Sequence, residues 1–407
     1  RIIVFNCGSS SLKYRLIEIP GEVELAGGEA ERVGAKTAEP ARIHHQVRGQ
    51  KETMTVDMPD HASAFSHVMK LLEREPSLVP DAIGHRMAHG GPHFKQHVIL
   101  DDAVMAELER IQDLAPIHNP PAVRLIAACR RLYPHLPETV VFDTVFHATI
   151  PEVARAYALP AAVAAQYGFR KYGFHGTSHQ YVAQESARLL GIPFEKLNAV
   201  SCHLGSGGAS LCAIVNGRSI DNTMGYSPLQ GLVMSTRSGD LDPAVALGLL
   251  VREAGNNAAV EGLLNRKSGV LGLSRISADI RDVVARAADG TTADVEQLSV
   301  ASQVYLWRIR KYLGAYLTLV GRAHCVIFTD TIGERVPYVR WAVTAGLEAF
   351  GLKIDPAKND GALALPVDLS TPDSRVRVLA VATNEEMAIA RFSYGLLLKA
   401  QKERMAR

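Results

Sequence analysis

A short apolar segment at the start of the chain leads directly into a turn of small polar residues. Residues 2–5 are isoleucine, isoleucine, valine and phenylalanine, and the turn runs from Asn6 through a glycine and three serines to Lys13. Phosphate binding needs clustered small donors, a backbone that a ligand can approach closely, and a cation, and this turn supplies all three. A hairpin turn rich in small residues is the alternative, so the rest of the chain has to decide between the two.

An arginine and an aspartate each follow an apolar segment. Arg86 comes after residues 82–84 and is able to make a bidentate contact with a carboxylate or phosphate, although taken alone a surface arginine near a turn is favoured. Asp143 ends the apolar segment 139–142, and α/β proteins place ligands at such strand ends. A carboxylate there suits a magnesium shell, proton chemistry or a helix cap.

Two loops in the second half of the chain carry a histidine and an arginine. His175 is flanked by glycines and precedes a helix that Ser178 is expected to cap and that is expected to end at Gly191. A lone histidine is more often structural, but one held between glycines at a helix N-terminus is a better candidate for an anion site. Arg237 stands among hydroxyls, a glycine and acids, which is typical of a charged-substrate loop or of a solvated loop.

Two glutamates, Glu385 and Glu386, begin the last helix directly after an apolar strand. Capping and the helix dipole ordinarily explain carboxylates at this position. Together with Asn6 and Asp143 they could also complete a site for a hard cation.

The elements that must position these residues alternate between strands and helices, which indicates an α/β fold. With 407 residues the chain is too long for one ordinary core, so two domains are expected. The predicted strands are 1–5, 14–19, 53–58, 139–142, 198–202, 209–215, 325–328 and 377–381. The predicted helices include one with Phe65, Val68, Met69 and Leu72 on one face, one capped by Asp101, one over 298–320, and one from Asn384 onward.

The sequence pattern of the opening turn is weakly repeated in the second half of the chain. Residues 202–208 again form a strand end, a polar residue and a Gly/Ser turn that leads into a second strand. Glycine-rich hairpins are common, but one copy in each half predicts two similar domains that each present a phosphate-gripping hairpin. The first domain is expected to comprise residues 1–147 and 384–407, and the second, with the nucleotide site, residues 148–383.

Composition excludes several classes of function. The net charge is only +2 and 47% of the residues are hydrophobic, so neither nucleic acid nor a membrane surface is expected as a partner. Neither a membrane-spanning run nor a signal peptide is expected. The five cysteines are scattered and form no CxxC pair, which favours reduced thiols in the cytoplasm and disfavours a structural zinc site.

The set of candidate groups is best matched to phosphoryl transfer. No serine or cysteine nucleophile with its base is recognisable, and neither the Gly-Lys-Ser/Thr phosphate loop nor the protein-kinase motif set is present. The remaining candidate groups are two phosphate-binding turns, the ligands of a magnesium ion and two separated arginines. Phosphoryl transfer is catalysed mainly by positioning and charge neutralisation, which such groups provide.

At this point the motifs resemble those of the acetate kinase family, which also includes propionate and butyrate kinases. The resemblance covers nearly the whole chain, and the motifs occur in the family's order. They are residues 6–13, 85–91, 115–120, 142–144, 172–179, 228–243 and 383–386.

This resemblance implies two actin-like, ribonuclease H-like domains around a central cleft, as in sugar kinases and heat-shock ATPases, with the last helix returning to the first domain. It implies reversible, Mg²⁺-dependent, direct in-line phosphoryl transfer from ATP to acetate, with Mn²⁺ as an alternative ion, and a homodimer. Arg86 and Arg237 would hold the carboxylate and the transferring phosphoryl group, and His175 would stabilise the transition state. Asp143 would organise magnesium or act on the protons. The residues that would complete the metal shell are Asn6 and Glu385.

Further roles implied by the resemblance concern the nucleotide and the acyl group. The residues that would contact phosphate or nucleotide are Ser9, Ser11, Lys13, His203, Leu204, Gly205, Ser206, Gly207, Asp279, Ile280, Arg281, Thr331, Ile332, Gly333, Glu334 and Arg335. The residues that would line the acyl pocket are Ala88, Ile117, Phe174 and Pro228. A short pocket favours an acid of two or three carbons, since each buried methylene contributes about 0.8 kcal/mol.

The chain departs from the family's pattern mainly in its nucleotide segments. Ser206 stands where asparagine is usual, and Gly208 reads as an insertion. Asp330 brings negative charge, and Thr331 a branched side chain, to a segment that is usually rich in glycine. We therefore expect weaker or altered nucleotide binding.

Two further departures lie near the acyl pocket. Pro92 replaces the usual glutamate, and Ala88 replaces a valine, so we expect some tolerance of propionate. The alternatives are a kinase for propionate or butyrate, one that uses pyrophosphate, and an inactive actin-like nucleotide-binding protein. Because Arg86, His175 and Arg237 are all present, the inactive alternative is disfavoured.

Overall fold

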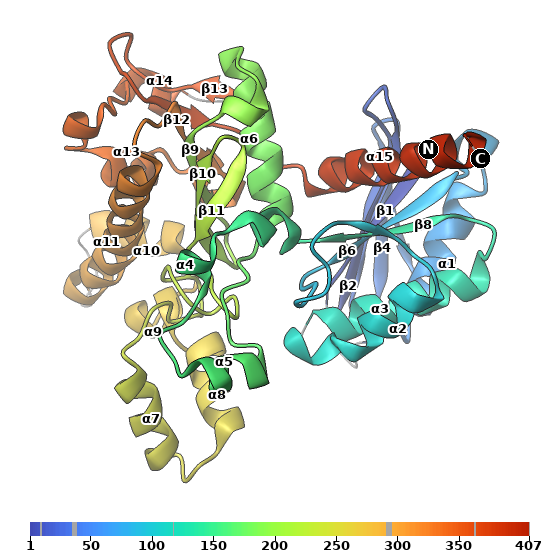
Figure 1. Ribbon diagram of the computed structural model, residues 1–407, viewed down its shortest axis with the longest axis horizontal. Helices are drawn as coiled ribbons and strands as arrows, with labels where there is room; N and C mark the ends of the chain where they lie inside the picture. The colour runs from blue at the N-terminus through green and yellow to red at the C-terminus, as the bar shows by residue number, and fades with distance from the viewer. Residues whose placement is uncertain (9, 35–38, 117, 290–294, 362–363, 407) are drawn as a thin grey trace. The chain divides into compact units, whose positions relative to one another are not determined.

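The computed structural model describes residues 1–407 apart from positions 9, 35–38, 117, 290–294, 362–363 and 407. Within that part the chain divides into two compact units (Figure 1). Unit 1 comprises Arg1–Val145 and Asn384–Arg407, and unit 2 comprises Phe146–Thr383. Each unit is built on one sheet with helices packed against it, so the predicted α/β class is confirmed.

Among its described residues, unit 1 has an eight-stranded sheet with the strand order β5-β4-β3-β2-β1-β6-β8-β7. The pairs β1·β2, β2·β3, β3·β4 and β4·β5 are antiparallel, whereas β1·β6 and β6·β8 are parallel. The strands are β1 Ile2–Cys7, β2 Ser11–Glu18, β3 Val23–Glu31, β4 Arg42–Val47, β5 Gln50–Thr55, β6 Ala82–Met87, β7 Val98–Ile99 and β8 Glu138–Phe142. The α-helices are α1 His61–Leu72, α2 Asp102–Arg110, α3 Asn119–Leu132 and α15 Glu385–Met405.

The two faces of this sheet are covered by different helices, as Figure 1 shows. Alternate residues of a strand point to opposite faces. Ile3, Phe5 and Ile83 pack in one core with α1 and α3. On the other face Gly84 leaves room for α15, because a side chain there would meet Ser393 and Ile389. The C-terminal helix therefore completes the core of the unit that the N-terminal strands begin.

Unit 2 repeats the central pattern of unit 1. Among its described residues the strand order is β11-β10-β9-β12-β14-β13, with β9·β10 and β10·β11 antiparallel and β9·β12 and β12·β14 parallel. The strands are β9 Ala199–Leu204, β10 Ala209–Val215, β11 Arg218–Asn222, β12 Cys325–Thr329, β13 Val367–Asp368 and β14 Arg377–Ala380. The α-helices are α4 Glu152–Arg155, α5 Ala161–Tyr167, α6 Gly176–Leu190, α7 Pro243–Arg252, α8 Asn257–Arg266, α9 Gly269–Ser274, α10 Ile280–Asp289, α11 Val295–Val320, α12 Asp330–Arg335, α13 Pro337–Thr344 and α14 Pro356–Asp360.

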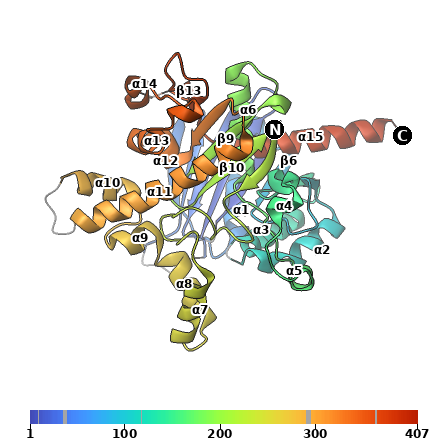
Figure 2. The same ribbon diagram turned by 60° about the vertical axis from the view of Figure 1, so that its left-hand side comes forward.

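Helices α6 and α11 cover the two faces of this second sheet, and Figure 2 shows α11 crossing β9 and β10. The two hairpins predicted from the sequence are both present. Each is closed by a backbone hydrogen bond from a glycine to the residue three positions later, Gly8 to Ser11 at 2.9 Å and Gly205 to Gly208 at 3.0 Å. The internal repeat therefore exists in the backbone as well as in the sequence.

Most predicted elements are present, and their ends differ by a few residues. Asp101 caps α2 through a 2.7 Å hydrogen bond from the Val104 amide, and Asn384 caps α15. The predicted strand 53–58 instead covers Gln50–Thr55, and the strands β3, β4, β6, β7, β11 and β13 were not predicted. None of the described helices has both the length and the apolar character needed to cross a bilayer.

The expected cap of α6 is wrong. This helix begins at Gly176, with His175 at the N-cap in the left-handed region at φ 59°. Ser178 lies inside the helix, where its hydroxyl is bonded to His203 and Thr383. A hydroxyl with two tertiary partners is not available to bond the helix's own amides, which explains the error. Gly191 does end the helix, at φ 65°.

Candidate functional site

Arg86 and Asn6 lie side by side on the face of the unit 1 sheet that α15 covers. Phe5 is paired with His85 across β1 and β6, so the next residues along, Asn6 and Arg86, are neighbours on the opposite face. His85 points to the α3 side and is held there by Glu138, with its Nε2 2.6 Å from the carboxylate. The buried pair fixes the end of β6 and with it the backbone of Arg86.

The guanidinium of Arg86 gathers three of the predicted site residues. Its Nη2 and Nε donate to the two carboxylate oxygens of Asp143 at 2.6 and 3.3 Å, and its Nη1 donates to Asn6 Oδ1 at 3.0 Å. Glu385, in the first turn of α15, lies 3.5 Å from Nε. Strands β1 and β6, the residue that follows β8 and the C-terminal helix thus contribute one side chain each to a single polar cluster, which we call the Arg86 cluster.

The Arg86 cluster combines one guanidinium with carboxylates. Burial alone would lower the pKa of Arg86, but the carboxylates of Asp143 and then Glu385 outweigh it and hold this pKa above its ordinary value. Two carboxylates face one guanidinium, and a third, Glu386, is paired with Arg15 at 3.7 Å. An all-oxygen donor set that includes carboxylates suits a hard divalent cation. The residues present therefore fit the magnesium shell that the sequence predicts.

The glycine-serine turn is next to this cluster in the sheet. Lys13 is opposite Asn6 in the β1·β2 register, and Ser11 begins β2. Lys13, Arg15 and Glu386 line a cavity of about 450 Å³ above strands β2 to β5. Ser9 lies outside the described residues.

The loop after β6 carries the predicted acyl contact Ala88, which is partly buried. Gly91 adopts φ +62°, which favours glycine, and a side chain at Gly90 would crowd Phe142. Burial lowers the pKa of the neighbouring His89 to about 4. Ile117, predicted to line the same pocket, lies outside the described residues. Phe174 and Pro228 belong to unit 2, so a common acyl pocket stays a prediction.

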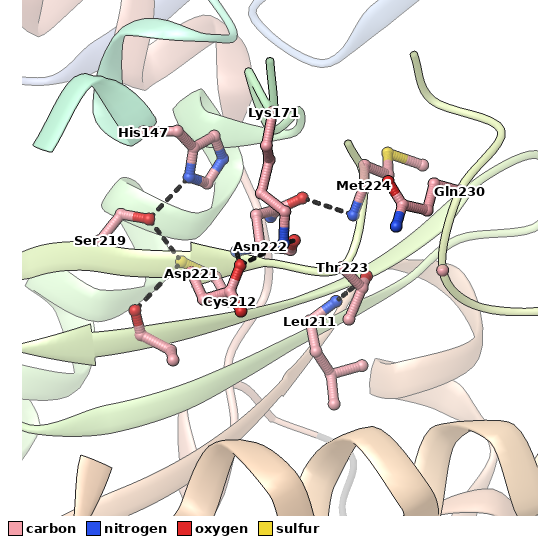
Figure 3. Close-up of polar contacts among 12 residues, drawn as sticks. His147, Lys171, Leu211, Cys212, Ser219, Asp221, Asn222, Thr223, Met224 and Gln230 are labelled. Atoms are coloured by element: carbon pink, nitrogen blue, oxygen red, sulfur yellow. Dashed lines mark hydrogen bonds and ion pairs between the residues drawn. The ribbon is translucent and has the colours of Figure 1, made fainter. Parts of the chain in front are cut away.

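In unit 2 the loop that carries His175 is anchored by two buried side chains shown in Figure 3. His147 Nε2 lies 2.9 Å from the carbonyl of Phe174, and its Nδ1 lies 2.8 Å from Ser219. Asn222 bonds the same residue twice, through the amide of Phe174 at 3.4 Å and its carbonyl at 3.3 Å. Lys171 extends the network through the Asn222 carbonyl at 2.9 Å. His175 is thereby held at the end of a fixed loop.

His175 and Arg237 converge on the turn between β9 and β10. A methyl group added to Gly208 would lie 3.3 Å from His175 Nε2 and 3.5 Å from Arg237 Nη1. Glycine at this position leaves that space free. The ring of His203 lies beside that of His175, with the ring centres 4.2 Å apart and the planes tilted by 32°. The inserted glycine is thus at the place where two candidate catalytic side chains meet.

Arg237 differs from Arg86 because no carboxylate among the described residues pairs with it. Its contacts are the Pro228 carbonyl at 3.5 Å and the Met234 sulfur at 3.8 Å. Burial lowers its pKa, which remains high enough for a permanent cation. A partly buried cation without a carboxylate partner is unfavourable unless an anion binds beside it. This part of unit 2 is therefore a candidate anion site.

Asp330 occupies the side of the same turn. Its carboxylate lies 3.0 Å from His203 Nε2, and a methyl group added to Gly205 would come within 2.4 Å of it. Burial would raise the pKa of Asp330, but the hydrogen bond and charge of His203 outweigh burial and hold this pKa well below its usual value. Asp330 also binds the amide and hydroxyl of Thr331. A fixed negative charge therefore lies against the predicted phosphate turn.

The other predicted nucleotide segments also come together in unit 2. Gly205, Ser206, Asp279, Ile280 and Ile332 line one small hollow of about 10 Å³, which has room for about one water molecule. Two of the remaining predicted residues have internal partners. Glu334 accepts from the amides of Asp330 and Thr383, and Arg281 is paired with Asp279. The remaining predicted residues, Leu204, Gly207, Gly333 and Arg335, belong to the same turn and to α12.

Sequence reasoning missed several residues that support this site. They are His147, Asn222, Ser210, Tyr305 and Arg340. Tyr305 is buried beside the small hollow, and its hydroxyl has no partner among the described residues. Each occurs singly within an apolar or ordinary segment, so no spacing pattern in the sequence could have marked them.

Removing the charge of Asp330 is expected to strengthen nucleotide binding. In Asp330→Asn, which keeps the size of the side chain and tolerates the left-handed φ of 63°, we expect the Kd for ATP with magnesium to fall about tenfold, because one repulsive charge is removed. Calorimetric titration measures this directly. Ordinary micromolar binding by the unaltered chain, with no gain in the variant, would contradict the idea that Asp330 weakens binding.

The comparisons with known proteins agree with one another over nearly the full length of the chain. A model of the acetokinase family matches residues 1–391. The acetate kinase of Dictyoglomus turgidum is 44% identical over 398 residues, which cover 96% of either chain. The crystal structure of Porphyromonas gingivalis acetate kinase superposes with a TM-score of 0.89 at 36% identity, covering 97% of this chain and 99% of that one.

A propionate kinase from Francisella tularensis superposes almost as well, with a TM-score of 0.88 at 32% identity over 96% of this chain and 98% of that one. Since both solved structures match nearly end to end, the actin-like acetate kinase fold predicted from the sequence is confirmed. The full-length family match and the identities above 40% point to the same group as the motifs do. The chain belongs to the acetokinase family.

Proposed function

We propose that this chain transfers the γ-phosphoryl group of ATP to acetate, giving acetyl phosphate and ADP. Family membership supports the reaction class, and relatives named acetate kinase support the acceptor. The observation that carries the proposal is the convergence of His175 and Arg237 on the free space at Gly208. An arginine without a carboxylate partner beside an imidazole is suited to an anion that offers several oxygens.

In the proposed reaction a carboxylate oxygen of acetate attacks the γ-phosphorus while the bond from phosphorus to the ADP oxygen breaks. Both reactants are anions, so catalysis consists mainly of neutralising charge and aligning the two groups. Arg237 binds anionic oxygens with its fork of donors, and His175 donates a hydrogen bond to the transferring group. The reverse reaction, in which acetyl phosphate rephosphorylates ADP, uses the same groups.

The Arg86 cluster has a complementary role in the proposal. Asp143 and Asn6 hold the Arg86 guanidinium in one orientation, so that its remaining edge is positioned for the acceptor carboxylate or the phosphoryl group. Asp143, Glu385 and Asn6 would hold Mg²⁺, with Mn²⁺ as an alternative. When bound, the ion supplies positive charge to phosphate oxygens. Lys13 and Ser11 are proposed phosphate contacts of unit 1.

The proposed nucleotide contacts of unit 2 are the turn from His203 to Gly207, the Asp279–Arg281 segment and α12. Their meeting around one hollow supports this assignment. That hollow is far smaller than a nucleoside. The adenosine group therefore binds either after these segments have moved apart or against their outer surface.

A hydroxamate assay tests the function. Acetyl phosphate is trapped with hydroxylamine while acetate, propionate and butyrate are each supplied with either ATP or pyrophosphate. We expect product with acetate and ATP in the presence of Mg²⁺. If product formed with pyrophosphate only, the phosphoryl donor would be pyrophosphate and not ATP. If kcat/KM were highest for propionate or butyrate, that acid would be the preferred acceptor in place of acetate. If no pair gave product, the inactive nucleotide-binding protein would be favoured.

The size of residue 88 is expected to set the preferred acid. We expect the unaltered chain to accept propionate, and Ala88→Val to raise the ratio of kcat/KM for acetate over propionate about tenfold, because two added methyl groups fill the space of the extra methylene. Ala88→Gly should move the ratio in the opposite direction. Equal discrimination by all three proteins would show that residue 88 does not line the acyl pocket.

The predicted homodimer has a candidate surface in α7. None of the ten residues of this helix is buried, although most are apolar, and Leu247 and Val251 are 64% and 80% exposed. These two side chains are four positions apart and share one face of the helix. We propose that this face contacts a second copy of the chain. The cytoplasmic location predicted from the sequence stays a prediction.

Light scattering after size exclusion tests that surface. The double variant Leu247→Asp, Val251→Asp is expected to be a monomer at concentrations where the unaltered chain is a dimer. Val153→Asp is the matched control, since Val153 is also exposed, at 90%, but lies on α4. A double variant that remains dimeric would show that the interface is elsewhere.

A further inference from the structure

His175 is the outer member of a chain of hydrogen bonds that runs into the core of unit 2. Its Nδ1 lies 2.9 Å from Ser210 Oγ, and the same oxygen lies 2.9 Å from His179 Nε2. On the far side of the second ring, His179 Nδ1 lies 2.9 Å from Ser201 Oγ. Ser201, His179 and Ser210 are all fully buried. Two hydroxyls and two imidazoles therefore alternate along one line.

The inner histidine is uncharged. Burial lowers the pKa of His179 far below its ordinary value, and the neighbouring rings of His147 and His203 act in the same direction. A neutral imidazole has one ring proton, so one nitrogen of His179 donates and the other accepts. The position of that proton decides the direction of every hydrogen bond in the chain.

Only one direction satisfies every hydroxyl. If His179 carries its proton on Nε2, the Ser201 hydroxyl donates to Nδ1, Nε2 donates to Ser210, and the Ser210 hydroxyl donates to His175 Nδ1. In the opposite direction the buried Ser201 hydroxyl proton would have no acceptor among the described residues. A buried donor without a partner is unfavourable. The first arrangement is therefore the stable one.

We infer that Ser210 and His179 hold His175 as a neutral imidazole with its ring proton on Nε2. A hydrogen bond donated to Nδ1 of His175 favours the neutral ring over the cation. The guanidinium of Arg237, which faces the same space, acts in the same sense, whereas the Asp330 carboxylate bonded to His203 acts against it. Ser210 and His179 are thus positioning residues for His175.

This tautomer directs the N–H of His175 toward the space at Gly208. His175 Nε2 is the ring atom closest to that space, 3.3 Å from a methyl group placed on Gly208. The catalytic consequence rests on the proposed function: His175 donates a hydrogen bond to the transferring phosphoryl group without bringing a positive charge or a second acidic proton. The positive charge then comes from Arg237 alone.

Labelled-histidine NMR tests the tautomer without any assay of activity. The chain is labelled with ¹³C and ¹⁵N in histidine, and the His175 signals are assigned by their loss in His175→Gln. We expect the shifts of an Nε2–H ring at pH 7.5. In Ser210→Ala and in Ser201→Ala we expect a mixture of tautomers, although Ser201 does not touch His175. An Nδ1–H or doubly protonated ring in the unaltered chain would overturn the inference.

Kinetics separate positioning from a structural role. Ser210→Ala is expected to lower kcat about tenfold with less than a twofold change in KM, and to move the acid limb of the kcat profile upward by about one pH unit because Nδ1 is free to take a proton. Ser210→Thr, which keeps the hydroxyl, should restore both. Ser186→Ala removes another buried serine hydroxyl, one in α6 without a partner among the described residues, and should change neither.

The outcomes remain distinguishable if particular variants fail. An unchanged pH profile and unchanged His175 shifts in Ser210→Ala would overturn the inference even if kcat fell. If acetate proved not to be the substrate, the NMR result would still decide the tautomer. If Ser210→Ala does not fold, the more distant Ser201→Ala carries the same test.

Discussion

Replacing Arg237 by alanine is expected to lower kcat/KM for acetate about a thousandfold while leaving the Tm unchanged or slightly higher. The loss of activity follows from the loss of a cation that meets transition-state charge, for which arginines in phosphoryl transfer contribute about 10³–10⁵ in rate. The unchanged Tm follows from the absence of a carboxylate partner among the described residues. Burying this cation costs free energy in the folded chain, and no ion pair offsets that cost, so removing the cation does not destabilise the fold. Hydroxamate kinetics and thermal unfolding measure the two effects.

Arg86→Ala is the matched comparison for Arg237→Ala. Arg86 neutralises Asp143, which is 2% exposed, so its removal leaves a buried carboxylate without its cation. We expect both activity and Tm to fall in this variant. If Arg237→Ala lowered the Tm as far as Arg86→Ala does, or kept activity within tenfold, the assignment of Arg237 as the arginine reserved for substrate would be wrong.

Arg340→Ala is expected to give a large loss of stability at a residue outside the Arg86 cluster and the candidate anion site of unit 2. Arg340 has no exposed surface, and its guanidinium donates to the carbonyls of Gly333, Glu334 and Asn359 and to the Asn359 side chain at 2.7–3.0 Å. Truncation leaves these acceptors unsatisfied and opens a cavity, for which we expect about 3–5 kcal/mol. That loss corresponds to a Tm lower by roughly 10 °C for a unit of this size.

Differential scanning calorimetry measures the effect, and Arg322→Ala, at an exposed arginine of the same unit, should change the Tm little. Because Arg340 holds two carbonyls of α12, Arg340→Ala should also raise the KM for ATP more than that for acetate. An Arg340→Ala protein with the Tm of Arg322→Ala would mean that the site relaxes and that the carbonyls find other donors.

Much of the Arg86 cluster could be anticipated from the sequence because its members come at the ends of apolar segments, although β6 was not among the predicted strands. Asp143 and Arg86 come at the ends of parallel neighbours, β8 and β6, and such ends meet at one edge of a sheet. Asn6 follows from the same rule applied to β1. The sequence could not show that the carboxylates would face an arginine, since this depends on the pairing order of the strands.

Unit 2 was harder to predict because its support comes from residues distant in the sequence. His147 and Asn222 fix the Phe174 carbonyl across 27 and 48 residues, respectively, and nothing in their local surroundings distinguishes them from other polar residues. The same holds for Ser210, which is significant only because β10 places it between two histidines. Ser178 misled the prediction because a tertiary hydrogen bond replaced the local cap. Local rules fail where tertiary partners compete for the same atom.

The return of α15 to unit 1 means that this half of the protein cannot finish folding until a segment beyond unit 2 has been translated. Residues 1–145 leave the ribosome well before Glu385, and until then Thr139 lacks its 2.6 Å bond to Ser393 and one face of the sheet around Gly84 is bare. Unit 2, by contrast, is contiguous and can fold as it emerges. Helix α15, which is translated after the whole of unit 2, therefore both closes the first core and delivers Glu385 to Arg86, so that a chain truncated before α15 has no complete Arg86 cluster.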